Sequence, residues 1–549
     1  MKNIVNIINF VRGVEPRPGR ENLDLVKPVK EQIALLRKFH LRGTFLLEYD
    51  ALINDTYIEL MKSCADICEV GLWLEIVQPL VEKIGETWYG RYPWDWYNDV
   101  GFLIGYEPDV RIRLVDEAME RFREIYGYYP ESVGSWHLDA VSLAHLEAKY
   151  HIKACCICRD QVGMDGYTLQ GGYYHQAYYP SKNNIFCPAN TLENQISVPV
   201  FRMLGSDPIH AYDYEIKKYG MRIVPSLEPV QYGKMPDWCD WYFRENFDGT
   251  GLAFQYTQVG QENSFGWHKM GEGLTYQMSQ VQKLVDEGAV EVMTLGESGK
   301  WYKSVFEQTP AAAYTAFHEY LDADRKSVWY CSRFYRTGLL WDDGVVYFRD
   351  MYIFDDEYKE KYLEKRCQTR ACEFRNLPVL DGVLFTGAND EQAAGVYFTA
   401  NGQNIIWTDF SYHEESMVDV PENEGEGAGK SAAGDMKTGN AQIGLANDKY
   451  KAVITLKENH IEIQCSDAAI QLHAVYNEDR ACGRNTSANK MFENSNADGS
   501  IITCPTYIRK QDDKVLYSFD GREYGIQIKK EQIGGSWKYT VWPLKYNRK

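Results

Sequence analysis

Charged side chains stand at the ends of apolar, strand-like runs along the first part of this 549-residue chain. In "VGSWHLDA", Trp136, His137 and Asp139 follow directly on a run with the apolar character of a buried strand. A carboxylate at this position could cap the helix that follows. It could also act on a substrate as a nucleophile or general acid. Both interpretations of Asp139 stay open at this point.

The same pattern recurs at several other strand ends. The charged residues, in chain order, are Arg12, Glu15, Glu48, Glu75, Arg159, Asp160, Arg202, Asp207, Glu228 and Glu297. Glu48, Glu75 and Arg202 lie within apolar runs, where an unpaired charge is costly. We therefore expect these three to pair with one another or with a ligand. Two facing carboxyl groups would suit glycoside hydrolysis, in which one protonates the leaving oxygen and the other attacks C1 or activates water.

Aromatic residues are abundant and clustered. They make up 14% of the chain, and they gather in the segments 87–102, 166–181 and 231–243. Each segment follows a predicted strand, so we expect loops that share one rim. Aromatic faces suit the C–H faces of sugar rings, which predicts a carbohydrate site; a purely structural rim is the alternative. The aromatic and imidazole side chains expected to contact substrate are Trp73, Trp94, Trp136, His137, Tyr232 and Trp238.

Alternating strands and helices would position these side chains. Strands are predicted at 3–10, 43–49, 67–75, 132–137, 152–158, 198–204, 221–228 and 290–296. Apolar residues at helical spacing predict helices at 28–40, 108–127 and 274–288. This alternation is typical of parallel β/α units. Seven or eight strands within about 300 residues favour a barrel, whose active site lies at the carboxyl ends of its strands.

The pattern changes at about residue 311. Apolar alternation punctuated by turn signals such as "DDG" and "FDGRE" predicts hairpins, and hence an all-β, sandwich-like domain. The Gly-rich, acidic segment 421–442 is interpreted as a mobile loop within it. We therefore expect two domains, a barrel over 1–310 and a β domain over 311–549.

Composition narrows the location and the partners. The formal charge of −19 disfavours binding to nucleic acid or to an anionic membrane. The chain carries no apolar run long enough to span a bilayer, and its first residues lack a signal-peptide pattern. Its 13 Cys show no metal-ligand spacing, which fits a reducing, cytoplasmic location. The sequence leaves homo-oligomerisation open.

The strand pattern and short motifs resemble the glycoside hydrolase/polysaccharide deacetylase superfamily over roughly residues 1–305. The resemblance implies a (β/α)7-type barrel. Metal-dependent deacetylases of this group carry an Asp pair after strand one, where "FVRG" has Val11 and Arg12. They also carry a His pair after strand three, where this chain has Trp73 and Val77. The departures imply no catalytic metal, and we expect no cofactor.

The segment "GSWHLDA" is closer to the family-57 and family-38 glycosidases. Its match implies that Asp139 is the nucleophile, with Asp in place of Glu, and that Glu228 is the acid. Glu75 and Asp160 are the substitutes, and Glu297 is expected to support the site. The sequence thus predicts a metal-independent glycoside hydrolase acting on an oligosaccharide or glycoside. Alternatives are another carbohydrate-active enzyme (lyase, transferase or deacetylase) or a non-catalytic sugar-binding barrel.

Overall fold

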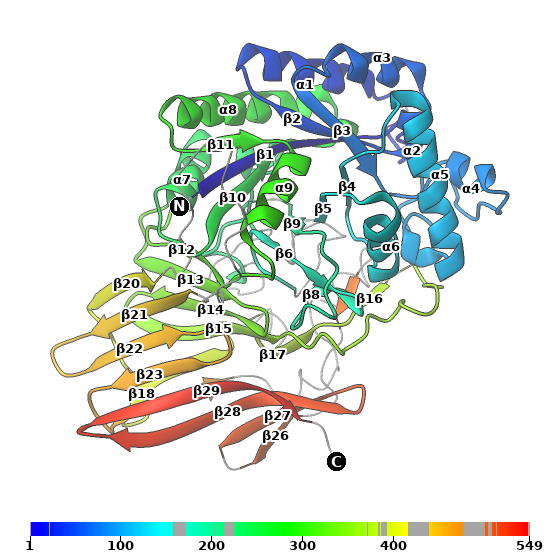
Figure 1. Cartoon of the computed structure of the whole chain (residues 1–549). Helices are drawn as coiled ribbons and strands as arrows, with labels where there is room; N and C mark the ends of the chain where they lie inside the picture. The colour runs from blue at the N-terminus through cyan, green and yellow to red at the C-terminus, as the bar shows by residue number, and fades with distance from the viewer. Residues whose placement is uncertain are drawn as a thin grey trace, which may run out of the picture.

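A curled sheet of parallel strands, wrapped by helices, is joined to a region whose described elements are strands (Figure 1). The structure is a computed structural model. It describes residues 2–20, 22–157, 172–203, 205–213, 224–370, 372–382, 385, 392–415, 439–475, 500–502, 508–511 and 513–546.

The parallel sheet is centred on β1 (Lys2–Val11), whose apolar side chains are almost all buried. The strand order is β10 (Phe254–Val259), β1, β2 (Gly43–Leu47), β3 (Cys68–Trp73), β4 (Ser132–Ser135), β5 (Ala154–Ile157), β9 (Val200–Arg202) and β6 (Ala177–Tyr178). β11 (Glu291–Met293) also pairs with β1 in parallel, and only β6 is antiparallel to its neighbour. The expected barrel is therefore confirmed in its coarse form, as a curled sheet of parallel strands.

Helices cover the outside of this sheet (Figure 1). They are α1 (Val26–Lys38), α2 (Tyr49–Leu52), α3 (Asp55–Ser63), α4 (Gln78–Lys83), α5 (Pro108–Tyr126), α6 (Ala140–His145), α7 (Pro236–Phe247), α8 (Trp267–Asp286) and α9 (Leu295–Val305). In α1, Val29, Ile33 and Leu36 face the core, as their spacing predicted. α5 ends at Gly127, whose φ of 83° is readily adopted by glycine.

The predicted strand 221–228 is not found in its described part. Residues 221–223 lie outside the described residues, and 224–228 form only an isolated bridge at Ser226. A strand that was not predicted, β10, pairs with β1 in parallel. Their register runs from Lys2 opposite Phe254 to Ile7 opposite Val259. The run 221–228 is more apolar than β10, whose sequence "FQYTQV" carries two Gln and a Thr. All six residues of β10 are buried in the parallel sheet, and this burial outweighs the weak strand pattern of its sequence.

The chain beyond residue 311 is built of strands, as expected. One sheet contains β12 (Ala312–Ala316), β13 (Arg325–Cys331), β14 (Tyr335–Asp342), β15 (Val345–Ile353), β17 (Leu377–Asp381), β18 (Gly395–Ala400), β19 (Gln403–Asn404) and β24 (Ile470–Val475). The other contains β20 (Asp409–Glu415), β21 (Asn440–Ala446), β22 (Lys451–Leu456), β23 (Ile461–Cys465), β26 (Ile508–Gln511), β27 (Lys514–Phe519), β28 (Arg522–Ile533) and β29 (Ser536–Tyr546). The boundary at 310/311 and the loop interpretation of 421–442, mostly outside the described residues, stay predictions.

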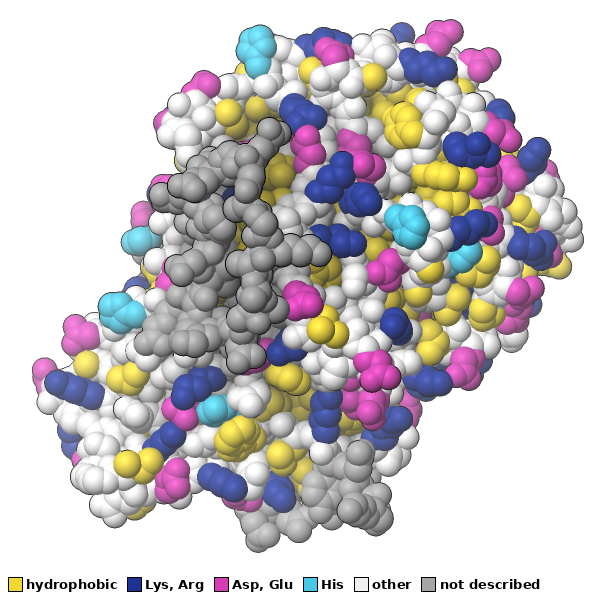
Figure 2. Space-filling view, in the orientation of Figure 1, with side chains coloured by type: hydrophobic (Ala, Val, Ile, Leu, Met, Phe, Trp, Pro, Cys, Tyr) yellow, Lys and Arg dark blue, Asp and Glu magenta, His cyan; other side chains and the backbone are white. Residues whose placement is uncertain are grey.

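Two short strand pairs lie outside these sheets. They are β7 (Pro180–Ser181) with β8 (Asn184–Pro188), and β16 (Cys372–Phe374) with β25 (Ser500–Ile502). Acidic and basic side chains are interspersed over the face shown in Figure 2. Within the described part of the chain, no helix is long and apolar enough to cross a membrane.

Candidate active site

The carboxyl ends of four neighbouring strands bring charged side chains together. Arg12 follows β1, Glu48 follows β2, Glu75 follows β3, and Glu262 follows β10. The Arg12 guanidinium lies 2.6 Å from Glu75, 2.7 Å from Glu262 and 3.6 Å from Glu48. Each of the four residues is at most 2% exposed. Glu48 and Glu75 thus have a charged partner, as expected, but it is Arg12; Arg202, the third residue expected to pair with them, lies beside Tyr178 instead.

Negative charge is in excess in this cluster, which we call the Arg12 cluster (Arg12, Glu48, Asp50, Glu75 and Glu262). Burial raises the pKa of Glu48 well above its usual range, and repulsion by Asp50 and Glu75 adds to the rise. Burial also raises the pKa of Asp50, although its carboxylate accepts hydrogen bonds from the backbone of Gly13 and Ala51. Burial and this repulsion therefore both favour the protonated form of Glu48.

Aromatic rings enclose the cluster. Trp73 donates its indole N–H to Glu75 at 2.8 Å, and the Arg12 guanidinium lies 4.3 Å from the ring centre of Trp94. Phe10 stacks on Trp73 at 4.0 Å, and Trp136 packs edge-on against both. Such rings lower the local dielectric, which strengthens the charge–charge interactions and favours a neutral Glu48.

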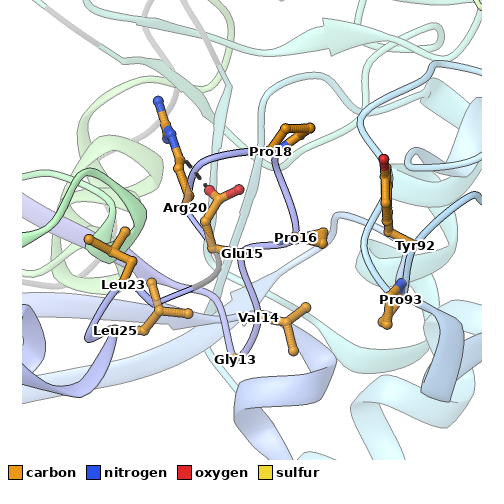
Figure 3. Close-up of a pocket in the computed structure, with 10 residues that line it drawn as sticks. All are labelled: Gly13, Val14, Glu15, Pro16, Pro18, Arg20, Leu23, Leu25, Tyr92 and Pro93. Carbon is orange, nitrogen blue, oxygen red and sulfur yellow. Dashed lines mark ion pairs between the residues drawn. The ribbon is translucent and has the colours of Figure 1, made fainter.

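A pocket of about 570 Å³ opens at loop 13–20, which leaves β1 directly above the cluster. In Figure 3, Leu23 and Leu25 lie on one side of this loop, and Tyr92 and Pro93 lie on the other. The loop itself contributes Gly13, Val14, Glu15, Pro16, Pro18 and Arg20. Tyr92 and Pro93 come from the aromatic segment 87–102, so one of the three predicted aromatic segments lines this pocket.

Arg17 connects the pocket with the cluster. Its guanidinium is bonded to Glu15 on the pocket wall and lies 3.8 Å from Glu262. It also lies 5.2 Å from the ring centre of Trp94. Trp94 thus contacts both Arg12 and Arg17, and a continuous set of charges runs from the pocket wall to Glu48.

Asp139 makes the contacts of a helix cap. Its side chain accepts hydrogen bonds from the backbone N–H of Ser142 at 3.0 Å and from the Ser142 hydroxyl at 2.8 Å, at the N-terminus of α6. It is also ion-paired to buried Arg111 at 3.2 Å. The capping alternative is confirmed by this geometry. The nucleophilic role of Asp139 stays a prediction, but both carboxylate oxygens are already engaged.

Glu360, from the segment between β15 and β16, is a second buried carboxyl beside Asp139 at the start of α6. It accepts hydrogen bonds from the N–H of Ala140 and of Ile185. Burial, followed by repulsion from Asp139, raises the pKa of Glu360 to about 8. These hydrogen bonds anchor the segment that carries Glu360 to the start of α6. The local sequence pattern had not indicated this contact.

Trp136 and His137 are core residues in this structure. His137 is 2% exposed, and its Nε2 lies 2.9 Å from the side-chain oxygen of Asn98. Burial lowers the pKa of His137 to about 3, so the ring is neutral. Its ring packs on Phe102 and Phe374. The predicted sugar contacts of Trp136 and His137 would require this packing to open.

The other two aromatic segments do not line the pocket where they are described. Segment 231–243 is largely helix α7, and Trp238 is fully buried within it. Residues 238, 241 and 242 lie at helical spacing, so the loop interpretation was wrong. In segment 166–181, Tyr173 stacks on Phe354 and Tyr174 stacks on Trp329. These tyrosines pack the barrel against the β region, which is the structural alternative to a sugar platform.

Glu297 lies at the opposite end of the sheet, so its expected place at the mouth was wrong. It forms a capping box with Thr294 at the start of α9 and an ion pair with Arg42, the residue that precedes β2. β11 pairs only with residues 4–6 of β1, while β1 continues to Val11. Because β11 is short, the chain leaves the sheet near the amino ends of the neighbouring strands.

The remaining predicted residues lie at several other places in the fold. Glu228 accepts a 3.3 Å hydrogen bond from Gln261, which adjoins Glu262, so it lies near the Arg12 cluster. Tyr232 packs edge-on against Trp238. Asp207 is buried and accepts from the backbone of His210, and Arg202 is buried at the end of β9 beside Tyr178. Arg159 and Asp160 lie outside the described residues.

Sequence reasoning missed Glu262 and Asp50 as members of the cluster. Glu262 follows the strand that was not predicted, in "QVGQENSF". The alternation in "AFQYTQV" followed by a polar run could have indicated it. Among the described residues, no group of three His, Cys, Asp or Glu side chains could hold a metal ion.

Comparison with known proteins yields structural likeness only. No protein-family model and no curated protein matches the chain. A solved chain from Parabacteroides distasonis, described as a candidate glycoside hydrolase/deacetylase, is 16% identical, with 69% of this chain and 90% of that chain covered and a TM-score of 0.46. A candidate polysaccharide deacetylase from Mycobacterium smegmatis is 12% identical, with coverages of 55% and 91% and a TM-score of 0.35.

A third solved structure is a candidate cellobiose-phosphate cleavage protein from Enterococcus faecalis V583. It is 11% identical, with 54% of this chain and 98% of that chain covered and a TM-score of 0.30. These values are too low to transfer a family or an activity to this chain.

Proposed function

We propose that this protein is a carbohydrate-active hydrolase whose carboxyl pair is Glu48 and Glu75. The observation that carries the proposal is the contrast between the surroundings of the two carboxyls. Burial and repulsion by Asp50 and Glu75 raise the pKa of Glu48, whose carboxyl lies 3.6 Å from Arg12, whereas Glu75 lies 2.6 Å from Arg12 and accepts a hydrogen bond from Trp73. Two carboxyls whose environments separate their protonation states can serve as acid and base or nucleophile.

The chemistry follows from these roles. Glu48 would give its proton to the leaving oxygen, and Glu75 would attack C1 or activate water as bond cleavage proceeds. Arg12 holds Glu75 in place with hydrogen bonds of 2.6 and 3.1 Å. The pocket supplies Tyr92 as a face for a sugar ring and Glu15 as a hydroxyl partner. The glycoside hydrolase activity predicted from the sequence thus has a carboxyl pair in a position different from Asp139 and Glu228.

Access requires a movement. The cluster is sealed beneath loop 13–20, and Gly13 contacts Asp50 so closely that an added Cβ would lie 2.8 Å from its carboxyl carbon. The loop contains Pro16 and Pro18, and Arg17 and Arg20 each contact Ser264 outside it. Substrate would reach the two carboxyls when this loop lifts away from Asp50.

Burial of the whole cluster favours one second candidate, a sugar-binding protein that performs no turnover. In that case the Arg12 cluster would be a structural layer, and sugar would bind in the pocket of loop 13–20 alone. The two functions differ in what Glu75 does, since only the hydrolase needs its carboxylate at the reacting carbon.

The test is a screen of purified protein against chromogenic α- and β-glycosides and acidic and neutral oligosaccharides, followed by variants. Glu75→Asp keeps the charge beside Arg12 but withdraws the carboxylate by one methylene. We expect it, like Glu48→Gln, to lower kcat/KM by about 10²–10⁴-fold with little change in Tm. Glu297→Gln, at the other end of the sheet, is the matched control and should keep full activity. Sugar binding without any hydrolysis would favour the second candidate.

A further inference from the structure

We propose that Arg20 makes the pocket of loop 13–20 selective for a sugar that carries a carboxylate or phosphate group. The inference deepens the proposed function, because it names the substrate class of the same site. It concerns binding in the pocket, however, and can be measured whether or not the protein turns the sugar over.

Arg20 is held from one side only. Its Nη1 lies 3.6 Å from Glu15 and 3.4 Å from the backbone oxygen of Ser264, both long contacts. Among the described residues, its Nε and Nη2 have no hydrogen-bond partner. The side chain is 30% exposed and lines the pocket. In Figure 3 the guanidinium stands beside Glu15, at the far end of the loop from Gly13 and Val14.

Glu15 is already committed to Arg17. It accepts hydrogen bonds from the Arg17 Nε at 2.8 Å and from the Arg17 backbone N–H at 3.0 Å, and it is also ion-paired to the Arg17 guanidinium. Burial and the neighbouring charge of Arg17 together lower the pKa of Arg20. The pocket wall therefore carries one guanidinium that is short of negative charge, although the chain as a whole has a charge of −19.

An anionic group would supply that charge. The Nε–Nη2 edge of a guanidinium is a planar fork that matches carboxylate or phosphate oxygens with two parallel hydrogen bonds. Tyr92, Pro93 and Leu25 provide apolar walls for a ring, and a volume of about 570 Å³ is in the range of small-ligand sites. A face for the sugar ring (Tyr92), a partner for its hydroxyls (Glu15) and a partner for its anionic group (Arg20) thus line one pocket. This combination fits a uronic acid or a sugar phosphate.

The experiment compares the binding of glucose, glucuronic acid and glucose 6-phosphate to the full chain by calorimetry. A charge-assisted, two-bond contact should make at least one acidic sugar bind about 10- to 100-fold more tightly than glucose. In Arg20→Gln this preference should disappear while affinity for glucose is unchanged. Arg42→Gln, which removes an exposed, ion-paired arginine at the other end of the sheet, is the matched control and should keep the preference.

The outcomes separate this inference from the proposed function. Glu75→Asp should lose turnover and retain the acidic preference. A wild-type protein that hydrolyses no glycoside but prefers an acidic sugar would overturn the hydrolase and leave the Arg20 inference standing. Equal affinity for all three sugars, or an acidic preference that survives Arg20→Gln, would overturn the inference. The stronger of the two acidic ligands identifies the group as carboxylate or phosphate.

Discussion

Replacing Arg12 with Met tests whether the buried cluster is held together by its one shared cation. The substitution keeps the apolar stem and removes the guanidinium. It eliminates the ion pairs to Glu75 and Glu262 at 2.6 and 2.7 Å, a hydrogen bond to Ser264 at 3.2 Å and the stacking over Trp94. Removing one partner of a buried ion pair typically costs about 3–5 kcal/mol, because the opposite charge is left uncompensated. We expect a loss in that range at pH 7.5.

The loss should depend on pH. Without Arg12, the glutamates of the cluster can escape repulsion only by taking up protons, which is easier at low pH. The difference in unfolding free energy between wild type and Arg12→Met should therefore be largest at pH 8 and shrink toward pH 5. The assay is urea unfolding followed by tryptophan fluorescence at several pH values, read at the transition that reports the barrel.

Two further variants sharpen the result. Arg42→Met removes an exposed ion pair with Glu297 and should cost at most about 1 kcal/mol. The triple change Arg12→Met, Glu75→Leu, Glu262→Leu replaces charges with apolar groups and should recover much of the loss. A loss below about 1 kcal/mol at pH 7.5, or a loss that is the same at pH 5 and pH 8, would refute the view that Arg12 neutralises this cluster.

Three other outcomes can be checked by thermal unfolding. The carboxylates of Asp207, Asp213 and Glu319 outweigh the opposing effect of burial and raise the pKa of His210 to about 9. This stabilisation is complete below pH 6.5 and lost as pH rises through 9, so His210→Gln should flatten the fall of Tm between pH 7 and 9.5. The pKa of Glu360 is raised to about 8, so the protein should lose stability as pH rises from 5 to 8. This loss should persist in His210→Gln, and a constant Tm between pH 5 and 8 in that variant would contradict the prediction. Asp139→Ala should lose at least about 1 kcal/mol, from the cap and from unpaired Arg111, and an unchanged Tm would contradict its capping role.

Several features of this protein follow from sequence alone. The alternation of apolar runs and amphipathic segments determines the parallel strands and the helices around them, because each element must bury its apolar face. Glu48 and Glu75 interrupt apolar runs at strand ends, which was sufficient to predict that each has a charged partner, although Arg202 was expected there and Arg12 is the cation they share. The change to hairpin turn signals after residue 311 likewise determines the all-β region, because such turns favour antiparallel neighbours.

Tertiary structure decided which of the candidate charges meet. Glu297 and Glu75 look alike in sequence, yet the shorter β11 places Glu297 at the other end of the sheet. Asp139 follows β4 as Glu75 follows β3, but Arg111 from α5 and the start of α6 occupy its oxygens. Glu262 joins the cluster because β10, a weakly patterned strand, lies beside β1. Strand length, register and long-range partners determine these positions, and a local sequence pattern carries no information about any of them.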